Sequence, residues 1–113
     1  MEKAPRWNQR RRVPRISVEL PVTLTWERKS FPCQARQLSE FGILVACEHK
    51  ELVGKDIQVR LKLDSPSRSL SLSGIVAYAI DNEIGVRFKD LSAEQQPVLK
   101  DYVEARRYNQ PVV

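Results

Sequence analysis

The sequence predicts an all-β protein: a six-stranded antiparallel barrel followed by one C-terminal helix. Between residues 16 and 89, apolar and polar side chains alternate with the period of two that is typical of half-buried strands. Short turn signals separate the alternating segments, and the period changes to that of a helix near the end of the chain. We expect the strands to close into a barrel, since closure removes exposed strand edges.

The first predicted strand covers residues 16–26, ISVELPVTLTW. Its side chains that are expected to face the core are Ile16, Val18, Leu20, Val22, Leu24 and Trp26. Pro21 has no backbone N–H to donate to a neighbouring strand, so we expect this strand to lie at an edge or to bend at a bulge. Residues 27–30 form a polar turn after it.

Five further strands follow at short intervals. Their expected ranges are 31–38 (FPCQARQL), 42–48 (GILVACE), 56–63 (DIQVRLKL), 69–80 (SLSLSGIVAYAI) and 84–88 (IGVRF). Within the long strand 69–80, Gly74 indicates a bend. The turn Asp81-Asn82-Glu83 joins this strand to the last one.

The segment 91–108, LSAEQQPVLKDYVEARRY, has the period of a helix. Ser92 is a good N-cap with Gln95 three residues later, which is the spacing of a capping box. The apolar stripe that would pack on the barrel consists of Val98, Leu99, Tyr102 and Val103. Because Pro97 has no N–H for the carbonyl of Ala93, either the first turn is separate or the regular helix begins near Pro97.

The positive charge of the chain is concentrated at its N-terminus. The formal net charge is +5, and residues 1–15 hold six basic side chains against Glu2, while the rest of the chain is balanced. Such a cluster indicates an anionic partner, although a solvated basic tail would have the same composition. We expect residues 1–9 to be a flexible arm, residues 10–108 to be one domain and residues 109–113 to be a short tail.

Several classes of protein find no support in the sequence. It contains no apolar stretch long enough for a membrane span or a secretory signal, so we expect a cytoplasmic protein. Cys33 and Cys47 are expected to be reduced, half-buried thiols, and with His49 as the single histidine we assign no metal site. No nucleophile, acid–base pair or glycine-rich phosphate loop is recognisable, so we expect no enzyme and no cofactor.

Two motifs in this order resemble those of the PilZ domain, a bacterial receptor module for cyclic di-GMP. Residues 11–15, RRVPR, match the family's RxxxR motif directly ahead of the first strand. Residues 37–42, QLSEFG, match its (Asp or Asn)-x-Ser-x-x-Gly motif, except that Gln37 replaces the acidic or amide residue. The stretch 74–92 followed by a helix is also similar to the end of a PilZ barrel, and the resemblance covers roughly residues 10–105.

The resemblance implies a cyclic di-GMP site in which Arg11 and Arg15 are the anchors. A guanidinium can meet the O6 and N7 acceptors of guanine, can pair with phosphate and can stack on a purine, which makes arginine suited to all three surfaces of this ligand. In the family, an arginine just before RxxxR is associated with a stacked pair of ligands, and this chain has Arg10 there.

The second motif supplies the other wall of that site. The resemblance implies that Gln37 accepts hydrogen bonds from a guanine edge. Its side chain is neutral, so these hydrogen bonds are weaker than those that a carboxylate would accept. Ser39 would donate to a phosphate or a base, and Gly42 would take a positive φ or let the ligand approach the backbone. Plain turn chemistry is the alternative explanation for both Ser39 and Gly42.

Two other functions stay open at this point. One is a PilZ-like adapter that acts through protein contacts without binding a nucleotide, which the replacement at Gln37 keeps open. The other is a small barrel that binds nucleic acid through its basic arm, but aromatic residues make up only 7% of the chain, fewer than base-stacking surfaces use. A single-domain receptor also requires a separate effector protein, which the sequence does not identify.

Overall fold

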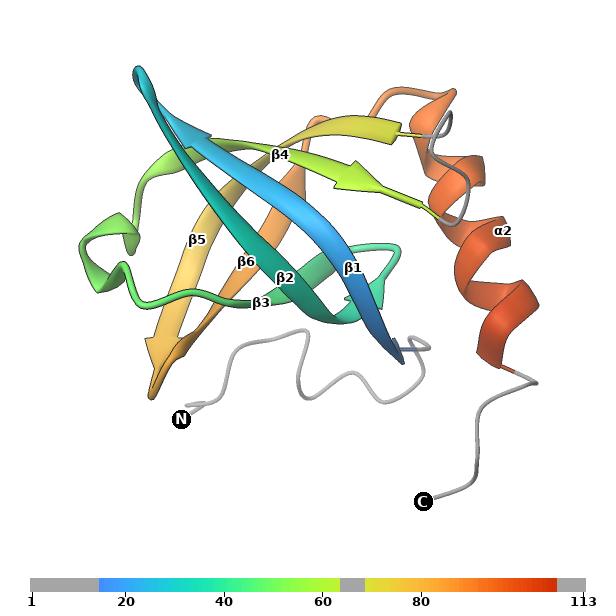
Figure 1. Cartoon of the computed structure of the whole chain (residues 1–113). Helices are drawn as coiled ribbons and strands as arrows, with labels where there is room; N and C mark the ends of the chain where they lie inside the picture. The colour runs from blue at the N-terminus through green and yellow to red at the C-terminus, as the bar shows by residue number, and fades with distance from the viewer. Residues whose placement is uncertain (1–14, 64–68, 108–113) are drawn as a thin grey trace, which may run out of the picture.

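The computed structural model describes residues 15–63 and 69–107, which form a six-stranded barrel and a helix (Figure 1). The predicted arm, the predicted tail and the candidate site residues Arg10 and Arg11 lie outside these residues. The strands are β1 (Arg15–Trp26), β2 (Lys29–Ser39), β3 (Gly42–Ala46), β4 (Asp56–Lys62), β5 (Ser69–Ile80) and β6 (Glu83–Lys89). A 3-10 turn, η1 (Lys50–Leu52), joins β3 to β4, and the helix α2 (Gln95–Arg107) follows β6. No helix in these ranges is long and apolar enough to span a membrane.

The six strands are antiparallel and close in the order β1-β2-β3-β6-β5-β4. The predicted all-β barrel is therefore confirmed. The expected edge position of the first strand is wrong, because β1 pairs with both β2 and β4. The alternative expectation, a bulge, fits the structure: the register of β1 with β2 shifts between Ser17 and Leu20, just before the proline, and the pairing of β1 with β4 begins only at Val22.

The alternation seen in the sequence fills the interior of the barrel. Along β1, Ile16, Leu20, Val22 and Leu24 are buried and Val18 is half-buried against the core, while Ser17, Glu19 and Pro21 are exposed. The other strands add the remaining core side chains, among them Ala35, Leu38, Ile43, Val45, Ile57, Val59, Leu61, Leu72, Val76, Ile84, Val86 and Phe88. Each of the Val, Leu, Ile and Phe side chains in this set contributes about 1.5–3 kcal/mol through removal from water, so the core stabilises the barrel.

The irregularity of β5 lies three residues after the predicted position. The register runs regularly through Gly74, which pairs with Ile57 and Phe88, and it shifts between Val76 and Tyr78. Gly74 is required for close packing instead, since a Cβ there would lie 2.6 Å from a methyl carbon of Val86. The bend predicted at Gly74 is thus a bulge at residue 77.

The helix begins with the predicted capping box. The Ser92 hydroxyl accepts from the Gln95 N–H at 3.0 Å, and the Gln95 side-chain oxygen accepts from the Ser92 N–H at 3.1 Å. Pro97 sits in the first turn of α2, where its missing donor has little cost. Leu99, Tyr102 and Val103 are buried where α2 packs against β1 and β2, which places the helix across one end of the barrel (Figure 1).

Candidate ligand-binding site

Arg15, the last residue of the first motif, lies beside the second motif on neighbouring strands of the barrel. Arg15, the first residue of β1, pairs with Ser39, the last residue of β2, and Ser17 pairs with Gln37. Arg15 is exposed while the next residue, Ile16, is buried, so the arginine side chain points away from the core. The strand pairing thus brings together Arg15, Gln37 and the Ser39–Gly42 turn, which we call the motif turn.

Ser39 holds the motif turn through its side chain. Its Oγ accepts from the backbone N–H of Phe41 at 3.0 Å and from that of Gly42 at 3.1 Å, and the hydroxyl lies 3.5 Å from the Gly42 carbonyl oxygen as a donor. The residue is 1% exposed and is a buried polar side chain of the barrel. In this structure the hydroxyl therefore serves the turn, as the alternative explanation from turn chemistry requires.

Gly42 is explained by the neighbouring strand. It starts β3 and pairs with Arg87 of β6, and a Cβ at this position would lie only 2.7 Å from the carbonyl oxygen of Val86. The expectation of a positive φ is wrong, because Gly54 is the one glycine in the described ranges with such a value. The close approach that Gly42 permits in the structure is thus an approach of two strands.

A bulge in β2 turns Gln37 toward the motif turn. Phe31, Cys33 and Ala35 follow the alternation of the core face, but the register with β3 shifts between Ala35 and Gln37, with Arg36 as the extra residue. Beyond the bulge Leu38 is the buried residue and Gln37 is half-buried on the outer face. Strict alternation from Ala35 would have placed Gln37 inside the barrel, so the bulge is what puts its amide on the same face as Arg15.

The structure adds two residues that the sequence reasoning missed. Arg87 is exposed on β6 directly opposite Gly42, so Arg15 and Arg87 flank the motif turn from its two neighbouring strands. Phe41, within the turn, has 50% of its surface exposed although it is large and apolar. The signal for Arg87 was its outward position in the alternating segment IGVRF, but only the strand order places it beside Gly42.

The space beside the motif turn is shallow. A hollow of about 200 Å³ lies between the turn and the start of the helix, lined in part by Glu40, Phe41 and Gln96. Cavities that enclose a ligand of drug size measure about 300–1,000 Å³. A dinucleotide held here would therefore lie on the surface of the barrel and would need an additional cover.

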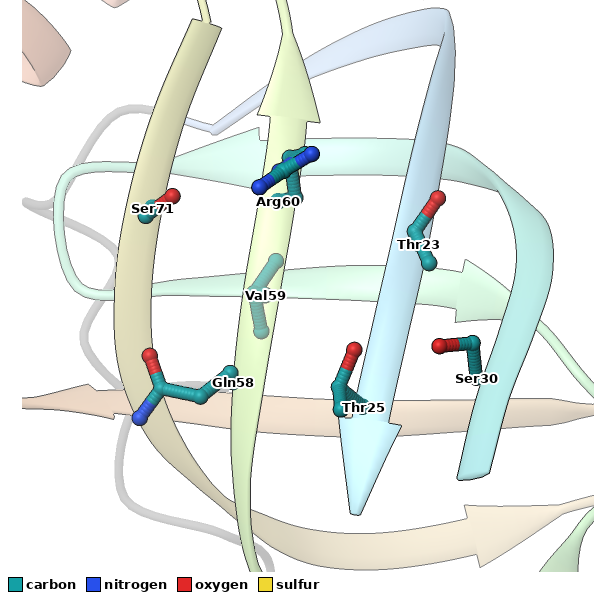
Figure 2. A pocket seen from close by; sticks show the side chains of 7 residues that line it. All are labelled: Thr23, Thr25, Ser30, Gln58, Val59, Arg60 and Ser71. Atoms are coloured by element: carbon teal, nitrogen blue, oxygen red, sulfur yellow. The ribbon is translucent and has the colours of Figure 1, made fainter. Parts of the chain in front are cut away.

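A larger polar cleft of about 410 Å³ lies elsewhere, on the outer face of β1, β4 and β5 (Figure 2). Hydroxyl groups, one amide and one guanidinium line it, from Thr23, Thr25, Ser30, Gln58, Arg60 and Ser71, together with Val59. Of the residues predicted from the two motifs, those that the structure describes (Arg15, Gln37, Ser39 and Gly42) do not line it. Within the described ranges, no group of three or more potential metal ligands is found either.

Comparison with known proteins assigns the family. The family model of the PilZ domain matches residues 9–105, which is most of the chain. The protein therefore belongs to the PilZ family, as the two motifs and the barrel indicate. No curated protein matches the chain.

Solved structures show the same fold at low sequence identity. The Bacillus subtilis inhibitor of motility (MotI/DgrA) is 19% identical with a TM-score of 0.78, and the match covers 97% of this chain and 58% of that one. The PilZ domain of YcgR from Escherichia coli, solved with c-di-GMP, is 19% identical with a TM-score of 0.69 and coverages of 92% and 100%. The PilZ domain of CeSA from a cellulose-synthesizing bacterium is 18% identical, with a TM-score of 0.68 and coverages of 82% and 97%.

Proposed function

We propose that this protein is a cyclic di-GMP receptor that binds the nucleotide on the face formed by Arg15, Gln37 and the motif turn. The observation that carries the proposal is the pairing of Arg15 with Ser39, which brings the end of the RxxxR motif against the second PilZ motif. The likeness to a PilZ domain solved with c-di-GMP supports the choice of ligand.

The proposed roles follow from the geometry. Arg15 pairs with phosphate or with the O6 and N7 acceptors of guanine, and Arg11 does the same from the preceding segment. The Gln37 side chain accepts hydrogen bonds from the N–H edge of guanine. Ser39 and Gly42 fix the turn backbone that faces the ligand, because the Ser39 hydroxyl holds two of its N–H groups. Since the hollow at the turn is small, we propose that the basic N-terminal arm supplies the cover.

Charge balance favours more than one ligand. Arg10 and Arg11 closely precede Arg15 in the sequence, and Arg87 adds a fourth cation beside Gly42. One cyclic dinucleotide carries two phosphate charges, so a stacked pair neutralises this set better than a single molecule does. We propose binding of the stacked pair, with a stoichiometry of two per chain.

The test is calorimetric titration with cyclic di-GMP. We expect Arg11→Ala and Arg15→Ala each to weaken binding by about 1.5–3 kcal/mol, and Gln37→Asp to strengthen it, since a charged acceptor forms the stronger hydrogen bond. Arg87→Ala should weaken binding by a smaller amount.

The matched control is Arg60→Ala, which removes the same charge from β4, where Arg60 pairs with Thr23 and Ser71 away from the motif turn. An Arg15→Ala variant that binds as well as Arg60→Ala would contradict the proposed site. Weaker binding by Gln37→Asp would contradict the role of Gln37. A stoichiometry of one would exclude the stacked pair but not the receptor.

The second candidate function is an adapter that does not bind a nucleotide, and Gln37 is the observation in its favour. No measurable heat with any cyclic dinucleotide would support it. The nucleic-acid alternative is separated by salt, because a polymer held through six or more phosphates loses about 10³-fold in affinity between 50 and 200 mM salt, and a dinucleotide does not. Guanine selectivity is a further test: cyclic di-AMP presents an amino donor in place of O6 and should bind far more weakly.

We propose that the signal passes to an effector protein in the cytoplasm. The exposed Phe41 ring, in the same turn as the ligand-facing backbone, is an apolar contact through which a partner could distinguish the occupied from the empty site. Phe41→Ser should weaken capture of that partner, and its cyclic di-GMP affinity has to be measured in parallel because Phe41 also lines the hollow at the motif turn.

A further inference from the structure

Two cysteines that are 14 positions apart in the sequence face each other across neighbouring strands. The pairing of β2 with β3 places Gln34 opposite Ala46, and extending this antiparallel register by one position, just beyond the end of β3, puts Cys33 opposite Cys47. Both thiols are reduced, Cys33 half-buried and Cys47 buried, and both belong to the core face of the barrel.

The backbone hydrogen bonds define which kind of pair this is. The Cys47 N–H donates to the Asn82 carbonyl oxygen at 2.9 Å, so the backbone of Cys47 is directed toward β6 and away from β2. Relative to β2, Cys33 and Cys47 therefore occupy a non-hydrogen-bonded position. At such positions the Cα atoms are about 4.5 Å apart and the side chains are at their closest, and disulfides span Cα separations of about 4.4–6.8 Å.

The surroundings of the pair allow a reagent to enter. Both cysteines line a cleft of about 460 Å³, together with Phe31, Ala46 and His49. The Cys33 thiol donates to the Phe31 carbonyl oxygen at 3.3 Å. Burial first, and then the charge and hydrogen bond of Cys47, raise the pKa of Cys33 to about 12, so its thiol is protonated and reacts slowly at neutral pH.

We propose that Cys33 and Cys47 form a reversible disulfide that links β2 to β3, made by exchange with a low-molecular-weight disulfide. One cysteine, as the thiolate, attacks a sulfur of the oxidant, forming a mixed disulfide and releasing one thiolate. The second cysteine then loses its proton, attacks the protein sulfur of the mixed disulfide and expels the other thiolate. Two cysteines are oxidised, one small disulfide is reduced to two thiols, and the two cysteine protons end on these products.

The disulfide would join the two strands at the end opposite the motif turn. β2 and β3 run antiparallel from the Cys33–Cys47 pair to Ser39 and Gly42, so a bond at one end closes a covalent loop that includes Gln37 and the whole turn. The inference does not depend on the proposed nucleotide, since it rests on strand pairing alone.

The test uses the full-length chain in glutathione buffers of graded ratio of oxidised to reduced form, with the oxidised fraction measured by intact mass spectrometry after acid quenching. If the native fold favours the bond, the folded chain should reach half oxidation at a ratio at least about tenfold more reducing than the same chain unfolded in urea. The product should be a monomer that has lost two hydrogen atoms, that maps to a peptide joining Cys33 and Cys47, and that returns to the starting mass with dithiothreitol.

Two outcomes would overturn the proposal. One is half oxidation of the folded chain at the same ratio as the unfolded chain, or at a more oxidising ratio. The other is a folded product that consists of glutathione adducts or of dimers between chains. The variants Cys33→Ser and Cys47→Ser serve as controls, because each leaves one thiol and should form only the adduct. Cyclic di-GMP titration of the oxidised and reduced chains is a separate measurement. If neither chain binds the nucleotide, the result on the disulfide still stands.

Discussion

Replacing Ser39 by alanine should destabilise the barrel although the change is small. The substitution removes the acceptor of two backbone N–H groups, those of Phe41 and Gly42, and leaves the site buried. A buried donor without a partner costs about 1–3 kcal/mol. The Gly42 N–H is fully buried, while the exposed Phe41 residue lets its own N–H reach water, so we expect a loss of about 2–3 kcal/mol in the free energy of unfolding.

Urea denaturation followed by tryptophan fluorescence measures this loss. With a denaturant slope of about 1–3 kcal/mol per molar for a small domain, the midpoint should fall by about 0.7–3 M. Ser73→Ala is the matched control, since the Ser73 hydroxyl also accepts a hydrogen bond, from the Gln58 amide at 3.0 Å, but on the exposed surface. That variant should change stability by no more than about 0.5 kcal/mol.

The comparison between the two serines decides the role of Ser39. Equal midpoints for Ser39→Ala and Ser73→Ala would refute the conclusion that the Ser39 hydroxyl holds the motif turn. A ligand contact by the same hydroxyl would then become its main role. A large loss of stability in Ser39→Ala, by contrast, means that weaker nucleotide binding by this variant has to be measured at a temperature where it is fully folded.

The remaining predictions concern packing and capping. Gly42→Ala should destabilise the barrel by about 1–3 kcal/mol, because the new methyl group would lie 2.7 Å from the Val86 carbonyl oxygen, and an unchanged urea midpoint would contradict this contact. Ser92→Ala should cost about 1 kcal/mol, since it removes the acceptor of the Gln95 N–H, and hydrogen exchange should rise in the first turn of α2 while the barrel amides keep their protection.

Most of the fold could be predicted because its signals are local. The alternation along residues 16–26 and the spacing of Ser92 and Gln95 depend on the periods of strands and helices, and both were confirmed. For Pro21 the edge alternative was wrong and the bulge alternative was closer, because a position without a partner on one of its two neighbouring strands tolerates proline as well as an edge does. The bend at Gly74 was misread for a similar reason, since a glycine can serve close packing as well as curvature.

The site could be predicted only in part. Arg15, Gln37, Ser39 and Gly42 were found through their motifs, and the structure brings them to one face. Arg87 could not be found, since its place beside Gly42 depends on the pairing of β3 with β6, between segments far apart in the sequence. The facing cysteines were missed likewise, because strand register is not visible in their spacing. Binding by Arg10 and Arg11 stays a prediction.

The bulge at Arg36 changes which positions of β2 face the core and which face the surface. In an unbroken strand, the parity of a position fixes whether it belongs to the core or to the surface, so a one-residue insertion or deletion interchanges the two along its whole length. In β2 the alternation between inward and outward side chains shifts by one residue between Ala35 and Gln37. The bulge accommodates Arg36 as an extra residue while Ala35 and Leu38 both stay in the core. Deleting Arg36 alone would leave Ala35 inward, Gln37 outward and Leu38 inward in regular alternation, so Gln37 would keep its place on the outer face. Straightening the bulge with Arg36 retained would instead turn Gln37 inward, and the surface would lose its polar acceptor without any change to a residue of either motif.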